Sequence, residues 1–199
     1  MDDIDPQVLE EIRHIEMLIG RNILVFQNVE HLLKDIHYFR QGAGTENNLA
    51  KRKIKIDELS LGRLSDKTVL NKIDSKLSSK SDSELHLSYD ILKDDQALNS
   101  AIKFFNDIND DRNFLVHNFT AKWPLDETEN RAQARTWLLS QYDAIFAQRD
   151  VLVTSLDIIV ERTNAISEYF NSDEGKKAWE KFISSEESQD VIFTFRLQT

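Results

Sequence analysis

The sequence predicts an all-α protein, an up-and-down bundle of long antiparallel helices. The 199 residues include only 5 glycines and 2 prolines, so the chain can make few turns and its elements must be few and long. Apolar residues recur at steps of three and four over long stretches, which is the spacing of one helix face. We therefore expect residues 1–199 to form one domain with a continuous core.

The composition narrows the class of protein. The chain has no cysteine, which excludes disulfides, thiolate zinc sites and thiol nucleophiles. A formal net charge of −10 argues against bulk electrostatic binding of nucleic acid, but leaves room for an enzyme with one local positive cleft. The acidic, amphipathic start and the lack of a membrane-length apolar run predict a cytoplasmic protein. No motif predicts a metal site or a cofactor.

The first helix should begin at Asp5-Pro6, because proline is favoured at the first helical position. A row of apolar residues then predicts a helix of about thirty residues, about 45–50 Å long. Asn22 is the one polar residue in that row, and two roles stay open for it: it fixes the register against a partner helix, or it reaches solvent. The apolar residues of the row are Val8, Ile12, Ile15, Ile19, Phe26, Val29, Leu33 and Ile36.

The next segments are shorter. Two glycines predict a loop over 41–48, and residues 75–83, rich in serine and charge, predict a mobile loop. A helical arm is expected over 59–77. Lys53–Asp57 alternates like a strand, and its only evident partner is the alternating tail from Ile192 to Leu197. Together they predict a small two-stranded sheet.

Two further helices follow. The third should begin at Asp94 or Asp95, run through Phe119 and be broken by Pro124. Asp126 and Glu129 resemble a capping box that starts a fourth helix over 128–170. Its length suits an antiparallel partner of the first helix. Residues 171–199 should form a C-terminal extension that begins with a short helix at 173–184.

One segment of the third helix carries residues suited to chemistry. Arg112 is followed by the polar Asn113, three apolar residues and His117. This pattern resembles the HEPN superfamily, whose ribonucleases carry an arginine, four to six residues and a histidine, with a polar residue directly after the arginine. The stretch from Leu59 to Leu64 is similar to a leucine-glycine-leucine segment of some members, and the resemblance covers about residues 7–170. It implies a homodimeric endoribonuclease, the toxin of a toxin–antitoxin or antiviral system, with an antitoxin or regulatory protein as partner.

These residue types suit RNA cleavage without a metal ion, in which the ribose 2′-hydroxyl attacks the adjacent phosphorus. His117 can move a proton near neutral pH, and Arg112 can stabilise the charge that develops on the phosphorane. Asn113 lies one helical turn before His117 and can orient the imidazole or hold a phosphate oxygen. Arg112 and His117 are separated by about 140° around one helix, so two chains are needed to bring them together.

Arg131 and Arg135 are expected near His117, because Pro124 reverses the chain between them. They are candidate contacts to the RNA backbone beside a helix N-terminus, and surface salt bridges to Glu127 or Glu129 are equally open.

Structural roles for the motif stay open as well. Arg112 can pair with Asp110 or Glu129, and His117 can cap a helix C-terminus. Two other functions therefore remain: a non-catalytic helical dimer that binds a nucleotide or a protein partner, and a bundle with an immunity or structural role and no ligand.

Overall fold

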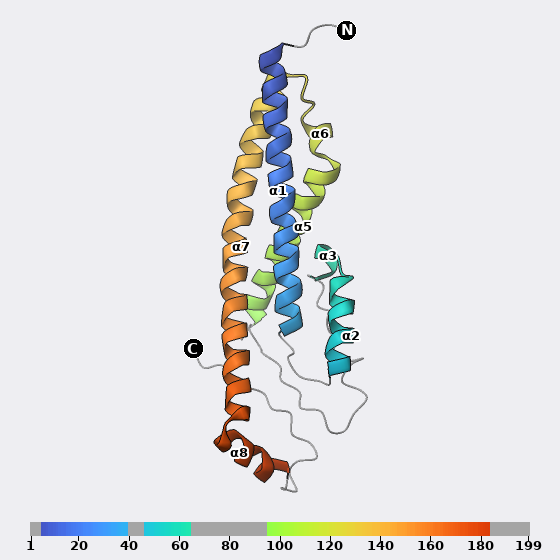
Figure 1. Cartoon of the computed structure of the whole chain (residues 1–199). Helices are drawn as coiled ribbons and strands as arrows, with labels where there is room; N and C mark the ends of the chain where they lie inside the picture. The colour runs from blue at the N-terminus through green and yellow to red at the C-terminus, as the bar shows by residue number, and fades with distance from the viewer. Residues whose placement is uncertain (1–4, 40–45, 65–94, 184–199) are drawn as a thin grey trace.

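The computed structural model describes residues 5–39, 46–64 and 95–183 of the chain. Within these ranges every regular element is a helix, which confirms the predicted all-α bundle (Figure 1). None of these helices is both long and apolar enough to cross a membrane. The long helices are α1 (Pro6–Phe39), α5 (Asp95–His117) and α7 (Thr128–Asn171), and the shorter ones are α2 (Glu46–Asp57), α3 (Leu61–Leu64), α6 (Phe119–Lys122) and α8 (Asp173–Ile183).

The two longest helices, α1 and α7, run parallel to each other, which corrects the expected antiparallel pairing. Glu11 contacts Arg131, and Asn28 contacts Arg149, so residue numbers rise in the same direction along both helices. α5 runs the opposite way beside them (Figure 1). The cause is topological: the short connection over 118–127 reverses the chain after α5, so α7 takes the direction that α1 already has.

Asn22 of α1 lies in the interface between these parallel helices. It is fully buried, and its Nδ2 donates to the carbonyl oxygen of Leu138 at 2.9 Å and to Oε1 of Gln141 at 3.0 Å. Of its two open roles, the structure therefore selects the fixing of register against a partner helix.

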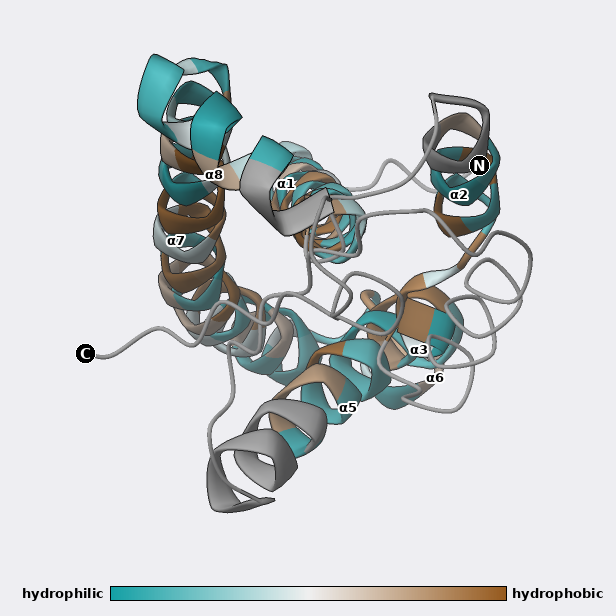
Figure 2. Cartoon of the chain, turned by 90° about the horizontal axis from the view of Figure 1, so that it is seen from below, coloured by the Kyte–Doolittle hydropathy of each residue, from teal (hydrophilic) through white to brown (hydrophobic). Residues whose placement is uncertain are grey.

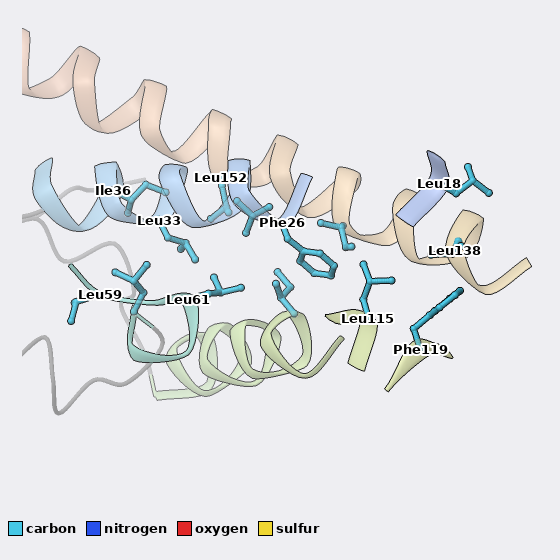
Figure 3. Close-up of a cluster of buried hydrophobic side chains, with 14 of the residues drawn as sticks. Leu18, Phe26, Leu33, Ile36, Leu59, Leu61, Leu115, Phe119, Leu138 and Leu152 are labelled. Carbon is cyan, nitrogen blue, oxygen red and sulfur yellow. The ribbon is translucent and has the colours of Figure 1, made fainter. Parts of the chain in front are cut away.

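The core lies between α1, α7 and α5, with α2 and α3 on the side away from α7 (Figure 2). α1 contributes a row at steps of three and four, as the sequence predicts, although the row passes through Leu18 rather than Ile19. Side chains from α7, α5 and the α2–α3 region meet this row (Figure 3). Among those labelled in the close-up are Phe26, Leu33, Leu61, Leu115 and Leu138.

The predicted strand at Lys53–Asp57 is wrong, because these residues form the end of α2. The physical reason is burial: Arg52, Ile56 and Leu59 face the interior at helical steps of four and three. Five alternating residues are too few to separate a strand from a helix by pattern alone. The proposed partner strand at 192–197 lies outside the described residues.

Other boundaries need smaller corrections. α2 begins at Glu46, inside the expected loop, and α5 ends at His117, so that Phe119 starts the separate helix α6. The N-cap of α7 is Glu127, which makes no capping hydrogen bond with its side chain, so the capping box of Asp126 and Glu129 is not formed. Of the arm expected over 59–77, the structure describes residues 59–64, with α3 at Leu61–Leu64. The expected loop at 75–83 lies outside the described residues.

Candidate functional site

The arginine–histidine motif occupies the last two turns of α5, where the chain turns into α6. An aromatic cluster holds this corner, with ring centroids 5.1 to 6.0 Å apart. Phe114 of the motif itself contributes one ring, so the backbone that carries Arg112 and His117 is tied to α6 and α7. The aromatic cluster consists of Phe114, Phe119, Trp123 and Trp137.

Arg112 is half-buried, and its Nη1 donates a hydrogen bond of 3.1 Å to Oδ1 of the neighbouring Asn113. Neither Asp110 nor Glu129 forms a salt bridge with it in the described part of the chain. Asn113 therefore positions the guanidinium group, whereas the sequence suggested that it would serve the imidazole or a phosphate. The bond leaves the remaining guanidinium donors of Arg112 available for an anion.

His117 is exposed at the last residue of α5 and makes no hydrogen bond with a described side chain. It lies about 140° around the helix from Arg112. One chain therefore does not bring the two side chains to a common point. Between them lies Val116, a large apolar residue that is 46% exposed. The motif thus presents polar groups and one apolar side chain on an open surface.

Acidic residues adjoin the motif on its N-terminal side. Partial burial of its carboxyl group, and then the nearby charges of Asp107 and Asp110, raise the pKa of Asp111 above its ordinary value. Its backbone oxygen accepts a long hydrogen bond of 3.5 Å from Nε2 of Gln141, the residue that also pairs with Asn22. The buried amide pair of α1 and α7 thus extends to the backbone of α5 beside Arg112.

Arg131 does not have the role that the sequence suggested. It is only 4% exposed, and its Nε donates to Oε2 of Glu11 at 2.7 Å. Its other nitrogens donate to the carbonyl oxygens of Leu125 and Asp126 and to Oγ1 of Thr128. A buried guanidinium with these partners ties the start of α7 to α1 and cannot contact an RNA backbone. Its partner Glu11 lies 120 positions away, beyond the reach of local pattern.

Arg135 is exposed and lies on the side of α7 that faces the start of α1. It lines a pocket of about 370 Å³ between the first turns of α1 and α7, together with His14, Glu10 and Thr128. No residue of α5 lines this pocket. Arg135 therefore faces α1 in this pocket, and its expected role as a contact to the RNA backbone beside His117 stays a prediction.

A stacked column of side chains that was not predicted from the sequence lies along the α1–α7 seam. The guanidinium carbon of Arg21 lies 3.6 Å from the ring centroid of Tyr142, which in turn stacks on Phe146 at 5.5 Å. Arg149 lies over Phe146 at 5.2 Å and donates from Nε to Oδ1 of Asn28 at 2.7 Å. The signal in the sequence is the step of seven residues between Arg135, Tyr142 and Arg149, which α1 repeats at His14, Arg21 and Asn28.

In the described ranges, no three histidine or acidic side chains lie close enough together to hold a metal ion. Comparisons of the chain with protein-family models, curated proteins and solved structures find no match. What the protein does must therefore be inferred from the chemistry and geometry of its own residues.

Proposed function

We propose that this protein is a metal-independent endoribonuclease of the HEPN type, the toxin of a toxin–antitoxin or antiviral system. The observation that carries the proposal is the Arg112, Asn113 and His117 motif at the open end of α5 in an all-α chain. The exposure of His117 and the hydrogen bond from Arg112 to Asn113 support it, because both side chains remain accessible to a substrate. The buried Arg131 has no part in it, and the role of Arg135 as an RNA contact is not needed for it.

The proposed reaction uses the 2′-hydroxyl of the substrate as nucleophile. The neutral imidazole of His117 removes the hydroxyl proton while the 2′-oxygen bonds to phosphorus. The bond from phosphorus to the 5′-oxygen breaks, and a protonated His117 of the second protomer supplies the proton that the 5′-oxygen gains. Arg112, held by Asn113, stabilises the negative charge of the phosphorane. The products are a 2′,3′-cyclic phosphate and a 5′-hydroxyl.

The proposal requires a homodimer in which the α5 ends of two chains face each other across a two-fold axis. A symmetric contact of this kind places Arg112 of one chain near His117 of its partner, which one helix cannot do. Val116, 46% exposed between them, is the apolar side chain that such a contact would bury. Val116→Asp should therefore abolish both dimerisation and cleavage. Light scattering at micromolar concentration should report about one monomer mass for the variant and about two for the wild type.

The decisive experiment is cleavage of a defined RNA oligonucleotide in EDTA. Wild type should produce the cyclic phosphate, and a single 2′-deoxy substitution at the cut position should stop the reaction there. His117→Ala should lower the rate by about 10²–10⁴-fold, and Arg112→Lys should not restore what Arg112→Ala loses. His31→Ala is the matched control, because His31 is an exposed histidine of α1. Loss of activity in EDTA, or cleavage at the 2′-deoxy position, would contradict the mechanism.

A second candidate function is a helical protein that binds a protein partner without catalysis. The column of Arg21, Tyr142 and Phe146 favours it, because this surface belongs to α1 and α7 and not to α5, which carries the motif. A folded dimer that cleaves no RNA under any condition would support this candidate over the first.

A further inference from the structure

One side of the α1–α7 pair carries a regular pattern of residues, which we call the heptad face. α5 packs against the other side of α7, where Gln141 reaches its backbone. Because α1 and α7 are parallel, residues 121 positions apart lie at the same height, and each helix repeats its pattern at steps of seven. The heptad face consists of His14, Met17, Arg21, Leu24 and Asn28 of α1 with Arg135, Leu139, Tyr142, Phe146 and Arg149 of α7.

Two apolar layers of this face are exposed to solvent. Met17 and Leu139 form one layer, with exposures of 59% and 39%, and Leu24 and Phe146 form the next, with 65% and 38%. The layers are seven residues apart, which is about 10.5 Å along a helix. Single exposed apolar residues need no explanation, but four in register on two neighbouring helices mark an interaction surface.

Polar layers with positive charge alternate with the apolar ones. Arg21 and Arg135 form no salt bridge with a described residue, in a chain that has 35 acidic residues. The Nε of Arg21 is buried without a hydrogen-bond partner in the described structure, its Nη2 donates a long hydrogen bond of 3.5 Å to Oδ1 of Asn22, and its guanidinium is held over Tyr142. Arg149 pairs with Asp150 and Asn28. The layers at Arg21 and Arg135 therefore carry cationic groups that form no ion pair in the described structure, although Glu10 and Glu11 line the same pocket as Arg135.

We propose that the heptad face binds an acidic amphipathic helix of a protein partner. Such a helix, laid along the seam, places apolar residues on the Met17 and Leu24 layers and carboxylates beside Arg135 and Arg21. The apolar layers and the arginine layers of the heptad face both repeat every seven residues. One partner helix with the same repeat can therefore contact all of these layers at once. Opposite charge selects this partner over a basic helix of the same apolar pattern. The surface is separate from the α5 motif, so the proposal does not depend on the proposed RNA cleavage.

Two other occupants fit the face less well. A second copy of the chain would set one heptad face against another and bring arginine layers together, which is unfavourable. Single-stranded RNA would need free aromatic surfaces for its bases. Arg21 lies over the ring of Tyr142, Phe146 stacks on the same ring, and Arg149 lies over Phe146. The side chains left exposed beside them are mostly aliphatic.

The test uses the full-length protein and a labelled synthetic peptide of about three heptads. The acidic peptide carries leucine at the two apolar positions of each heptad and glutamate at the flanking positions, and the basic peptide has lysine in place of each glutamate. Fluorescence anisotropy measures binding. Arg135→Glu and Leu24→Ser test the two kinds of layer. Lys122→Glu on α6 and Val151→Ser, which is 61% exposed elsewhere on α7, are the matched controls.

The acidic peptide should bind saturably and more tightly than the basic peptide. Arg135→Glu and Leu24→Ser should each weaken it about tenfold or more, and both controls should leave it unchanged. Equal binding of the two peptides, no saturable binding, or equal losses in the controls would overturn the proposal. So would a dimer that Leu24→Ser converts to a monomer, because the occupant would then be a second copy.

Nucleic acid is tested separately, with a mixed-sequence single-stranded RNA and His117→Ala protein, so that cleavage plays no part. The RNA affinity should be the same with and without Arg135→Glu. If the RNA instead binds and Arg135→Glu flattens the salt dependence by about 0.7 in logarithmic slope, the face contacts phosphates and the proposal is wrong.

Discussion

Replacing Asn22 with leucine tests the buried amide contact that sets the register of α1 against α7. The substitution keeps the approximate side-chain size and removes the Nδ2 amide group, which donates to the carbonyl oxygen of Leu138 and to Oε1 of Gln141. Gln141 is 5% exposed, so water cannot replace the lost donor at its Oε1. The change therefore leaves a polar atom buried without a partner.

The expected loss is about 2–4 kcal/mol of unfolding free energy. An orphaned buried acceptor costs about 1–3 kcal/mol. The carbonyl oxygen of Leu138 also loses the hydrogen bond that it accepts from Asn22, although Leu138 remains part of the α7 helix. This is a large share of a typical stability of about 5–15 kcal/mol. Urea unfolding followed by tryptophan fluorescence and far-ultraviolet circular dichroism measures it.

A double substitution separates this cause from a general packing defect. In Asn22→Leu with Gln141→Leu, both partners are apolar and no amide is orphaned, so the double variant should be more stable than the sum of the single effects predicts. We expect a coupling of about 1–2 kcal/mol. A single variant within about 0.5 kcal/mol of wild type, or effects that simply add, would refute the reasoning.

Three other predictions concern stability. Arg131→Ala should lower the unfolding free energy by about 1.5–3 kcal/mol, because it removes the buried guanidinium that donates to Glu11 and to the carbonyl oxygens of Leu125 and Asp126; urea unfolding should also show that Arg131→Lys does not restore it. Gly20→Ala should raise the unfolding free energy by about 0.5–1 kcal/mol, because the added Cβ meets nothing within 4 Å. Gly175→Ala should lower the unfolding free energy, because its Cβ would lie 1.9 Å from the backbone oxygen of Tyr169. Thermal unfolding of the two variants measures both effects. The raised pKa of Asp111 makes the folded state bind this proton more readily than the unfolded state, so this group's contribution to stability falls as pH rises through that pKa. Asp111→Asn should therefore raise the melting temperature at pH 7 and change it little at about pH 3.

The helices themselves could be predicted from the sequence because their signals are local. Asp5-Pro6 marks the start of α1, and the observed N-terminal hydrogen bond from Gln7 to Asp5 is of the expected kind. The starts of α5 at Asp95 and α8 at Asp173 were also expected, and α7 begins at Thr128 as expected although the capping box that suggested this start is not formed. Each depends on residues within one or two turns, whose spacing and capping preferences do not change with the rest of the fold.

The motif at Arg112 and His117 was also readable from spacing, as a hypothesis about chemistry. Its local setting at the end of α5 agrees with the prediction, but the contact between Arg112 and Asn113 was not foreseen. Side-chain rotamers decide such contacts, and spacing alone does not specify them.

Only the tertiary structure decided how the helices are arranged. The parallel direction of α1 and α7, the partners of Asn22 and the burial of Arg131 all depend on contacts between residues 116 to 121 positions apart. Amphipathic periodicity shows which face of a helix is buried, but it is the same whichever way the neighbouring helix runs. Arg131 therefore looked like a surface arginine in the sequence, and it became a buried structural residue because the fold brought Glu11 to it.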